Sequence, residues 1–86
     1  MKKLTEFEIA KAFNYNETLT EKAKTIIFND GVKNSDELLN AIDNAFVYNY
    51  DIWQLLQYYY NPTDDNINFL DALDLFYNDL YKLLGF

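Results

Sequence analysis

Apolar side chains recur at helical intervals through most of the chain, and short polar joints separate the apolar stretches. The first stretch predicts a helix that begins at Thr5, because the threonine hydroxyl and the Glu8 carboxylate can complete a capping box. This helix is expected to end near residues 14–16. Its apolar arc consists of Phe7, Ile9, Ala10 and Phe13.

A second helix is predicted to begin at Thr18, because Thr18 and Glu21 repeat the capping-box spacing. Four apolar residues at i, i+4, i+7 and i+8 form its buried stripe: Leu19, Ala23, Ile26 and Ile27. Residues 29–31 close this helix, since Gly31 can adopt the left-handed conformation that is common just after a helix C-terminus.

The third helical stretch begins at a cap on Asn34 or Ser35, and its length has two alternatives. Its apolar face consists of Leu38, Leu39, Ile42, Ala45 and Phe46. One alternative is a single helix that reaches about Tyr60. That helix keeps further residues in phase, namely Ile52, Leu56 and Tyr59. The other alternative is a break near Asn49, with Asp51 and Gln54 forming a new cap.

The last helix follows the clearest boundary in the chain, at Pro62, because the residue before a proline is pushed out of helical geometry. Asp64 and Asp65 precede this helix, and Gly85 marks its end. Its apolar face consists of Phe69, Leu70, Leu73, Phe76, Tyr77, Leu80, Leu83 and Leu84. The sequence therefore predicts an all-α bundle of four or five helices, formed by one domain that spans residues 1–86.

Composition removes several classes of site. The 86 residues include no cysteine, histidine or arginine, so disulfides, the usual zinc and haem ligands and a histidine-based triad are all missing. The run Asp64-x-Asn66-x-Asn68 resembles the start of a calcium loop, but Phe69 stands where glycine is needed and Leu75 where a bidentate glutamate is needed. We therefore expect neither an enzyme nor a bound cofactor or metal.

The N-terminal residues and the lengths of the apolar runs bear on location. Lys2 and Lys3 are followed by Glu6 and Glu8, where a signal peptide needs a continuous apolar run. Apolar runs are also far shorter than the roughly 20 residues of a membrane span. We expect a soluble, intracellular protein.

Charge is unevenly distributed along the chain, whose net charge is −7. Residues 1–33 carry six lysines and five acids, whereas residues 34–86 carry one lysine, Lys82, and nine acids. Long-range repulsion opposes direct binding of nucleic acid by such a chain. A concentrated negative charge instead favours a partner with a basic surface.

The candidate partner-binding residues gather on and before the last helix. Asp71 and Asp74 share one of its faces, Asp64 and Asp65 extend the acidity, and Leu75 projects from the polar face near Asp79. An exposed leucine among carboxylates resembles a binding hot spot with a charged rim. Tyr58 and Tyr60 are candidates for the same surface, whereas Tyr59 and Trp53 are expected to pack inside. The alternative for all of these residues is a solvated helix face with ordinary packing tyrosines.

In size, charge and composition, the whole chain resembles the small anti-defence proteins of phages and mobile elements, the anti-CRISPR and anti-restriction proteins. That resemblance implies a non-enzymatic inhibitor in the cytoplasm of a bacterial host cell, a DNA mimic whose acidic surface occupies the nucleic-acid groove of a nuclease. Residues 58–65 also resemble the Tyr-Tyr-Pro segment of colicin-type immunity proteins, which implies the alternative of an immunity protein or antitoxin. A third possibility is a homodimer with Leu75 and the aromatic residues between the copies.

Overall fold

Five α-helices and one π-helical turn form the part of the chain that the computed structural model describes, residues 4–46, 50–60 and 68–86. No strand occurs in these ranges, so the predicted all-α bundle is confirmed. In chain order the helices are α1 (Glu6–Ala12), α2 (Glu17–Lys24), the π-helical turn η1 (Thr25–Asn29), α3 (Ser35–Phe46), α4 (Tyr50–Tyr60) and α5 (Phe69–Leu84). The predicted boundary at Pro62 and the acidic pair Asp64 and Asp65 lie outside the described residues.

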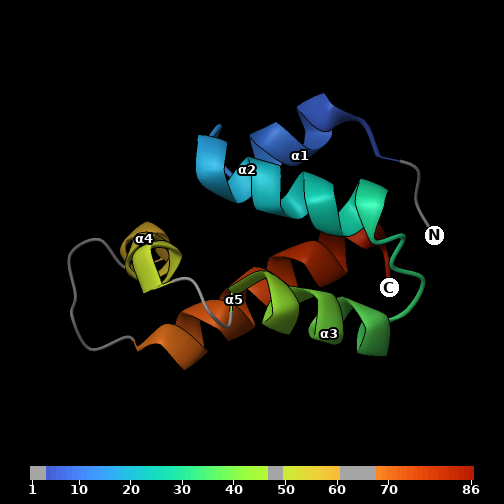
Figure 1. The fold of residues 1–86 in the computed structure, drawn as a ribbon. Helices are drawn as coiled ribbons and strands as arrows, with labels where there is room; N and C mark the ends of the chain where they lie inside the picture. Colours follow the sequence, from blue (N-terminus) through green and yellow to red (C-terminus); the bar gives the residue numbers. More distant parts are fainter. Residues whose placement is uncertain (1–3, 47–49, 61–67) are drawn as a thin grey trace.

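The helices are arranged in two layers with α4 at one end (Figure 1). Helices α1 and α2, with η1 continuing α2, form a hairpin that lies over α3 and α5, and α4 is seen end-on beside them. Helix α5 packs against α1, α3 and α4, which makes it the central element of the bundle. Both ends of the described chain lie at the same side of the molecule, away from α4.

Side-chain caps set where most helices begin. The capping box at α1 is confirmed: the Glu8 amide donates to Thr5 Oγ1 at 3.2 Å and the Thr5 amide to Glu8 Oε1 at 3.4 Å. The box predicted at Thr18 is wrong. Helix α2 is capped two residues earlier by Asn16, whose Oδ1 accepts from the Leu19 amide at 3.0 Å. Asparagine is at least as good an N-cap as threonine, and capping at Asn16 adds residues to the helix.

The turn between α1 and α2 is tight. Asn14 and Tyr15 both have left-handed backbones, with φ of 53° and 60°, and the Tyr15 amide donates to the Ala10 carbonyl at 2.8 Å. After α2 the helix widens into η1, in which the Asp30 amide donates to the Thr25 carbonyl at 3.0 Å. The predicted left-handed Gly31 is confirmed, with φ of 63°.

The third stretch is broken into two helices, so the second of the two alternatives is confirmed. Helix α3 ends at Phe46 and α4 begins at Tyr50, and the two run in different directions (Figure 1). The predicted cap at Asp51 is wrong, because Asp51 already lies in the first turn of α4. Carbonyls at a helix C-terminus lack partners within the helix. Trp53 supplies one here, because its indole Nε1 donates to the Phe46 carbonyl.

Three phenylalanines, one just after α1 and the others on α3 and α5, meet at the centre of the core. The ring of Phe76 on α5 lies 5.2 Å from that of Phe13 and 5.2 Å from that of Phe46, measured between centroids, and all three side chains are fully buried. Most of the predicted core residues are buried with them, namely Ile9, Leu19, Ala23, Ile26, Ile27, Leu38, Ile42, Leu56, Leu80 and Leu84. The helical periodicity therefore located most of the core.

Three residues predicted to face the core are instead exposed. Phe7 is 65% exposed, Leu70 is 67% exposed, and Leu39 also faces solvent. Each lies at the edge of an apolar arc that is wider than the contact its helix makes in this small bundle. Ala41 on α3 and Ala72 on α5 are buried although the larger Leu39 and Leu70 on the same helices are exposed. A short side chain lets neighbouring helices approach closely.

Candidate protein interface

One face of α5 is open to solvent along most of its length. Seven exposed residues form this face, which we call the outer stripe of α5: Leu70, Asp71, Asp74, Leu75, Asn78, Tyr81 and Lys82. They recur at intervals of three and four residues, so they share one side of the helix, opposite the side that holds Phe76 and Leu80. The helix is held at both ends, by Asn68 Oδ1 accepting from the Asp71 amide at 2.9 Å and by the left-handed Gly85.

The carboxylates of Asp71 and Asp74 lie on this stripe as the sequence predicts, and both residues are exposed. Within the described ranges no lysine forms an ion pair with either of them. The described ion pairs instead join Lys24 to Glu6 at 3.6 Å and to Glu21 at 3.2 Å, in the N-terminal layer. The negative charge of the stripe is therefore available to a cationic partner.

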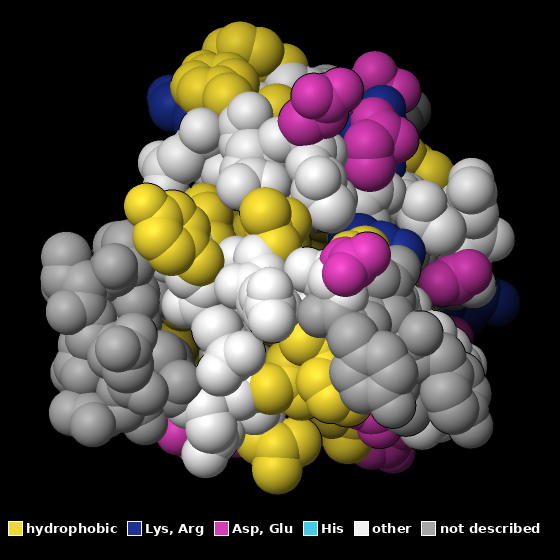
Figure 2. Space-filling model, turned by 60° about the vertical axis from the view of Figure 1, so that its left-hand side comes forward, with side chains coloured by type: hydrophobic (Ala, Val, Ile, Leu, Met, Phe, Trp, Pro, Cys, Tyr) yellow, Lys and Arg dark blue, Asp and Glu magenta, His cyan; other side chains and the backbone are white. Residues whose placement is uncertain are grey.

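Figure 2 shows one face of the molecule, on which charged and hydrophobic side chains both reach the surface. In that view acidic side chains in the upper part lie beside lysines, and further acidic side chains are partly visible along the lower edge. Hydrophobic side chains also reach the surface between the two regions. This face thus combines carboxylates with apolar area.

Apolar residues flank the carboxylates of the outer stripe. Leu75 is 39% exposed, in agreement with its predicted position on the polar face. Leu70 and Tyr81, which the sequence analysis did not assign to the site, lie on the other edge of the stripe. Their spacing of four and seven residues from Asp74 was the available signal, but the apolar character of Leu70 placed it on the predicted core face instead.

Tyr60 and Asp79 bond to each other. The Tyr60 hydroxyl donates to Asp79 Oδ2 at 2.6 Å, and both residues are half-buried where α4 meets α5. This bond fixes the end of α4 beside the Leu75 edge of the stripe. Tyr58, two residues earlier, is 69% exposed. Of the two predicted tyrosines, Tyr58 is therefore the one with a free surface, and Tyr60 holds the helices together.

Tyr59 and Trp53 are half-buried and pack against the core, as predicted. The Tyr59 ring lies 6.4 Å from that of Phe13, and its hydroxyl accepts from Asn14 Nδ2 at 3.1 Å. Trp53 stacks on Phe69, with ring centroids 4.2 Å apart and an interplanar angle of 17°. These contacts hold α4 against the turn after α1 and against the start of α5. They therefore help to fix the position of the helix that carries the outer stripe.

Alkaline pH is expected to destabilise the protein, in part through Tyr60. Burial raises the pKa of the Tyr60 hydroxyl above its ordinary value of 10, and the hydrogen bond to Asp79 raises it further. Above pH 10 the unfolded chain loses this proton while the folded chain keeps it, so the free energy of unfolding falls as pH rises. Urea unfolding between pH 8 and pH 11 measures the slope. Tyr60→Phe should lower stability by about 1 kcal/mol at pH 7 and show a shallower alkaline slope, and equal slopes would contradict the assignment.

The described residues contain no group of three or more side chains suited to hold a metal ion. None of their helices is both long and apolar enough to cross a membrane.

Comparison with known proteins gives no family assignment. No protein-family model matches the chain, and neither a curated protein nor a solved structure is significantly similar to it. Function therefore has to be inferred from the chemistry and shape of the surface.

Proposed function

We propose that this protein is a non-enzymatic inhibitor that docks the outer stripe of α5 on a basic, nucleic-acid-binding surface of another protein. The observation that carries the proposal is the exposure of Asp71 and Asp74 on one helix face, without an ion pair to any described lysine. Clustered like charge opposes folding, and a cationic partner offsets that cost on binding.

In this proposal, charge speeds the encounter with the partner and apolar area stabilises the complex. The net charge of −7 accelerates encounter with a cationic surface and makes the complex sensitive to salt. Leu75 and Leu70 on α5, with Tyr58 on α4, supply area that loses water in the complex. A surface that binds DNA or RNA presents lysines and arginines to phosphates, and the carboxylates of the stripe can occupy that position instead.

The resemblance to anti-CRISPR and anti-restriction proteins supports a nuclease of a bacterial defence system as the partner. In this proposal the protein acts in the cytoplasm of the host cell and competes with nucleic acid for the groove of that nuclease. Inhibition requires occupancy alone, so no catalytic residue and no cofactor are involved.

Affinity capture with a nucleic-acid competitor tests the proposal. The immobilised protein is incubated with a lysate of the cell that carries its gene, and retained proteins are released with a double-stranded DNA oligonucleotide. We expect a lysine- and arginine-rich nucleic-acid-binding protein to be released. The Asp71→Lys, Asp74→Lys double variant should retain about tenfold to a hundredfold less of it, because two favourable charge pairs become repulsive.

The matched control is Asp36→Lys, Asp43→Lys on α3. It reverses the charge of two exposed aspartates, so the net charge changes by the same amount as in the stripe variant. Asp36 lies in the first turn of α3, as Asp71 does in α5. Retention by this control should stay within about threefold of the unmodified protein if position rather than total charge matters. Equal retention by both double variants, or no release by DNA, overturns the proposal. Release of a toxin encoded beside this gene would replace the anti-defence reading with an immunity protein.

A further inference from the structure

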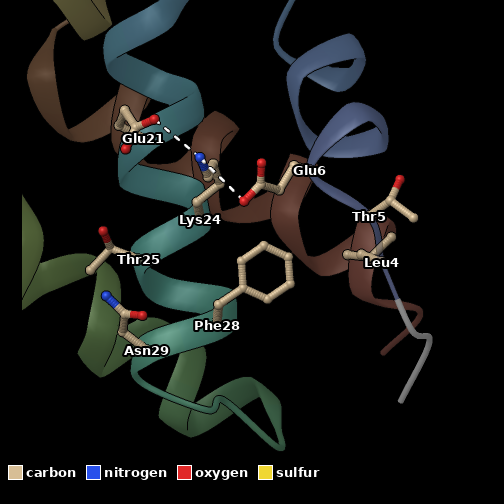
Figure 3. A pocket seen from close by; sticks show the side chains of 8 residues that line it. All are labelled: Leu4, Thr5, Glu6, Glu21, Lys24, Thr25, Phe28 and Asn29. Atoms are coloured by element: carbon tan, nitrogen blue, oxygen red, sulfur yellow. Dashed lines mark hydrogen bonds and ion pairs between the residues drawn. The ribbon is translucent and has the colours of Figure 1, made fainter.

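A concave surface lies in the N-terminal layer, away from the outer stripe. It is a cleft of about 570 Å³ between the start of α1 and the α2–η1 helix (Figure 3). Leu4 and Glu6 line one wall, and Glu21, Lys24 and Phe28 line the other. Residues 21, 24 and 28 lie at helical spacing, so one face of α2 and η1 is turned toward the cleft.

The cleft carries an excess of negative charge. Glu6 and Glu21 both contact the ammonium of Lys24, at 3.6 and 3.2 Å, so their carboxylates lie on either side of one positive charge (Figure 3). The hydrogen bond to Glu21, together with the charges of Glu21 and Glu6, raises the pKa of Lys24 above 10.5 despite the opposing effect of burial, so the lysine stays charged. Two carboxylates and one ammonium leave one negative charge uncompensated.

An aromatic ring lies beside this charge. Phe28 is 46% exposed, and Figure 3 shows its ring projecting from η1 toward Leu4 and the Lys24–Glu6 pair. A cation above an aromatic face is attracted by the negative face of the ring. Phe28 belongs to a π-helical turn, and such turns recur at functional sites.

We propose that this cleft receives an arginine side chain of a partner protein, stacked on the Phe28 ring and paired with the Glu6 carboxylate. A guanidinium suits the site better than an ammonium, because it is planar, stacks on rings and bonds a carboxylate through two N–H groups. The arginine brings the charge of the group to zero, with Lys24 and the arginine alternating with the two acids. This site is separate from the outer stripe and does not depend on it.

Amide NMR titration with a capped arginine, N-acetyl-arginine methylamide, tests the proposal on the full chain. Capped citrulline is the control ligand, because it has nearly the same shape without the charge. We expect shifts at residues 21–29 with arginine and at least fivefold smaller ones with citrulline at equal concentration. Equal shifts with both ligands, or arginine shifts spread over the whole surface, overturn the proposal.

Variants of the cleft and of surfaces outside it locate the binding. Phe28→Ala should weaken the arginine titration at least threefold, and Phe7→Ala, which removes an exposed phenylalanine outside the cleft, should not. Should Phe28→Ala lose its helical circular dichroism, Glu21→Gln provides the same test through charge. Unchanged titration in a folded variant of either kind contradicts the site. The Asp71→Lys, Asp74→Lys variant should titrate normally, so failure of the stripe and failure of the cleft are distinguishable.

Discussion

Phe76→Ala is expected to lower the free energy of unfolding by about 3–5 kcal/mol, the range for removing a buried aromatic ring. Phe76 is fully buried and its ring contacts those of Phe13 and Phe46. The three residues come from different segments, so the cavity would loosen the centre of the bundle rather than one helix. A domain of this length has only about 4–13 kcal/mol in total. Urea unfolding followed by circular dichroism should therefore show a much earlier transition or none.

Leu70→Ala is the control for this prediction. It removes an aliphatic side chain from the same helix, at a position that is 67% exposed, and should change stability by less than about 0.5 kcal/mol. A loss below about 1 kcal/mol in Phe76→Ala would mean that the three rings are not the centre of the core.

Trp53→Ala is expected to cost about 2–4 kcal/mol, less than a fully buried ring because Trp53 is half-buried. The substitution removes the stack on Phe69 and the hydrogen bond to the Phe46 carbonyl. These two contacts join α4 to α5 and to the end of α3. The angle between α3 and α4 is then no longer fixed, and the amide signals of all three helices should shift in an NMR spectrum.

Trp53→Phe separates the stacking on Phe69 from the hydrogen bond to the Phe46 carbonyl. It keeps a ring that can stack on Phe69 and loses only the N–H donor, so about 1–2 kcal/mol is expected. A loss as large as that of Trp53→Ala would assign the effect to the hydrogen bond and not to stacking. Since Trp53 is the single tryptophan, its fluorescence reports the unfolding of the unmodified protein directly.

Helix ends were predictable where a local signal had no competitor. The capping box at Thr5, the left-handed Gly31 and the helix end at Gly85 involve residues close in sequence, and each was found where expected. The cap at α2 was misplaced because Asn16 and Thr18 are both good caps, and only the tight turn after α1 selects between them.

At the candidate site, too, some features were predictable from the sequence and others were not. The exposure of Asp71, Asp74 and Leu75 followed from their phase on a helix whose opposite side is strongly apolar. The bond between Tyr60 and Asp79 could not be anticipated, because it depends on how α4 crosses α5. The cleft beside Phe28 was equally hidden, since its walls come from two helices and from a π-helical turn that has no plain sequence signature.

By itself the sequence determined that the chain is helical, which residues fill most of the core, and that negative charge concentrates after residue 33. Periodicity and composition are local properties, so one sequence is sufficient to reveal them. Only the tertiary structure decided that the third stretch breaks, that Phe7, Leu39 and Leu70 remain exposed, and which carboxylates keep their charge unpaired. Those outcomes depend on which helix faces meet, and helix phase alone does not specify that.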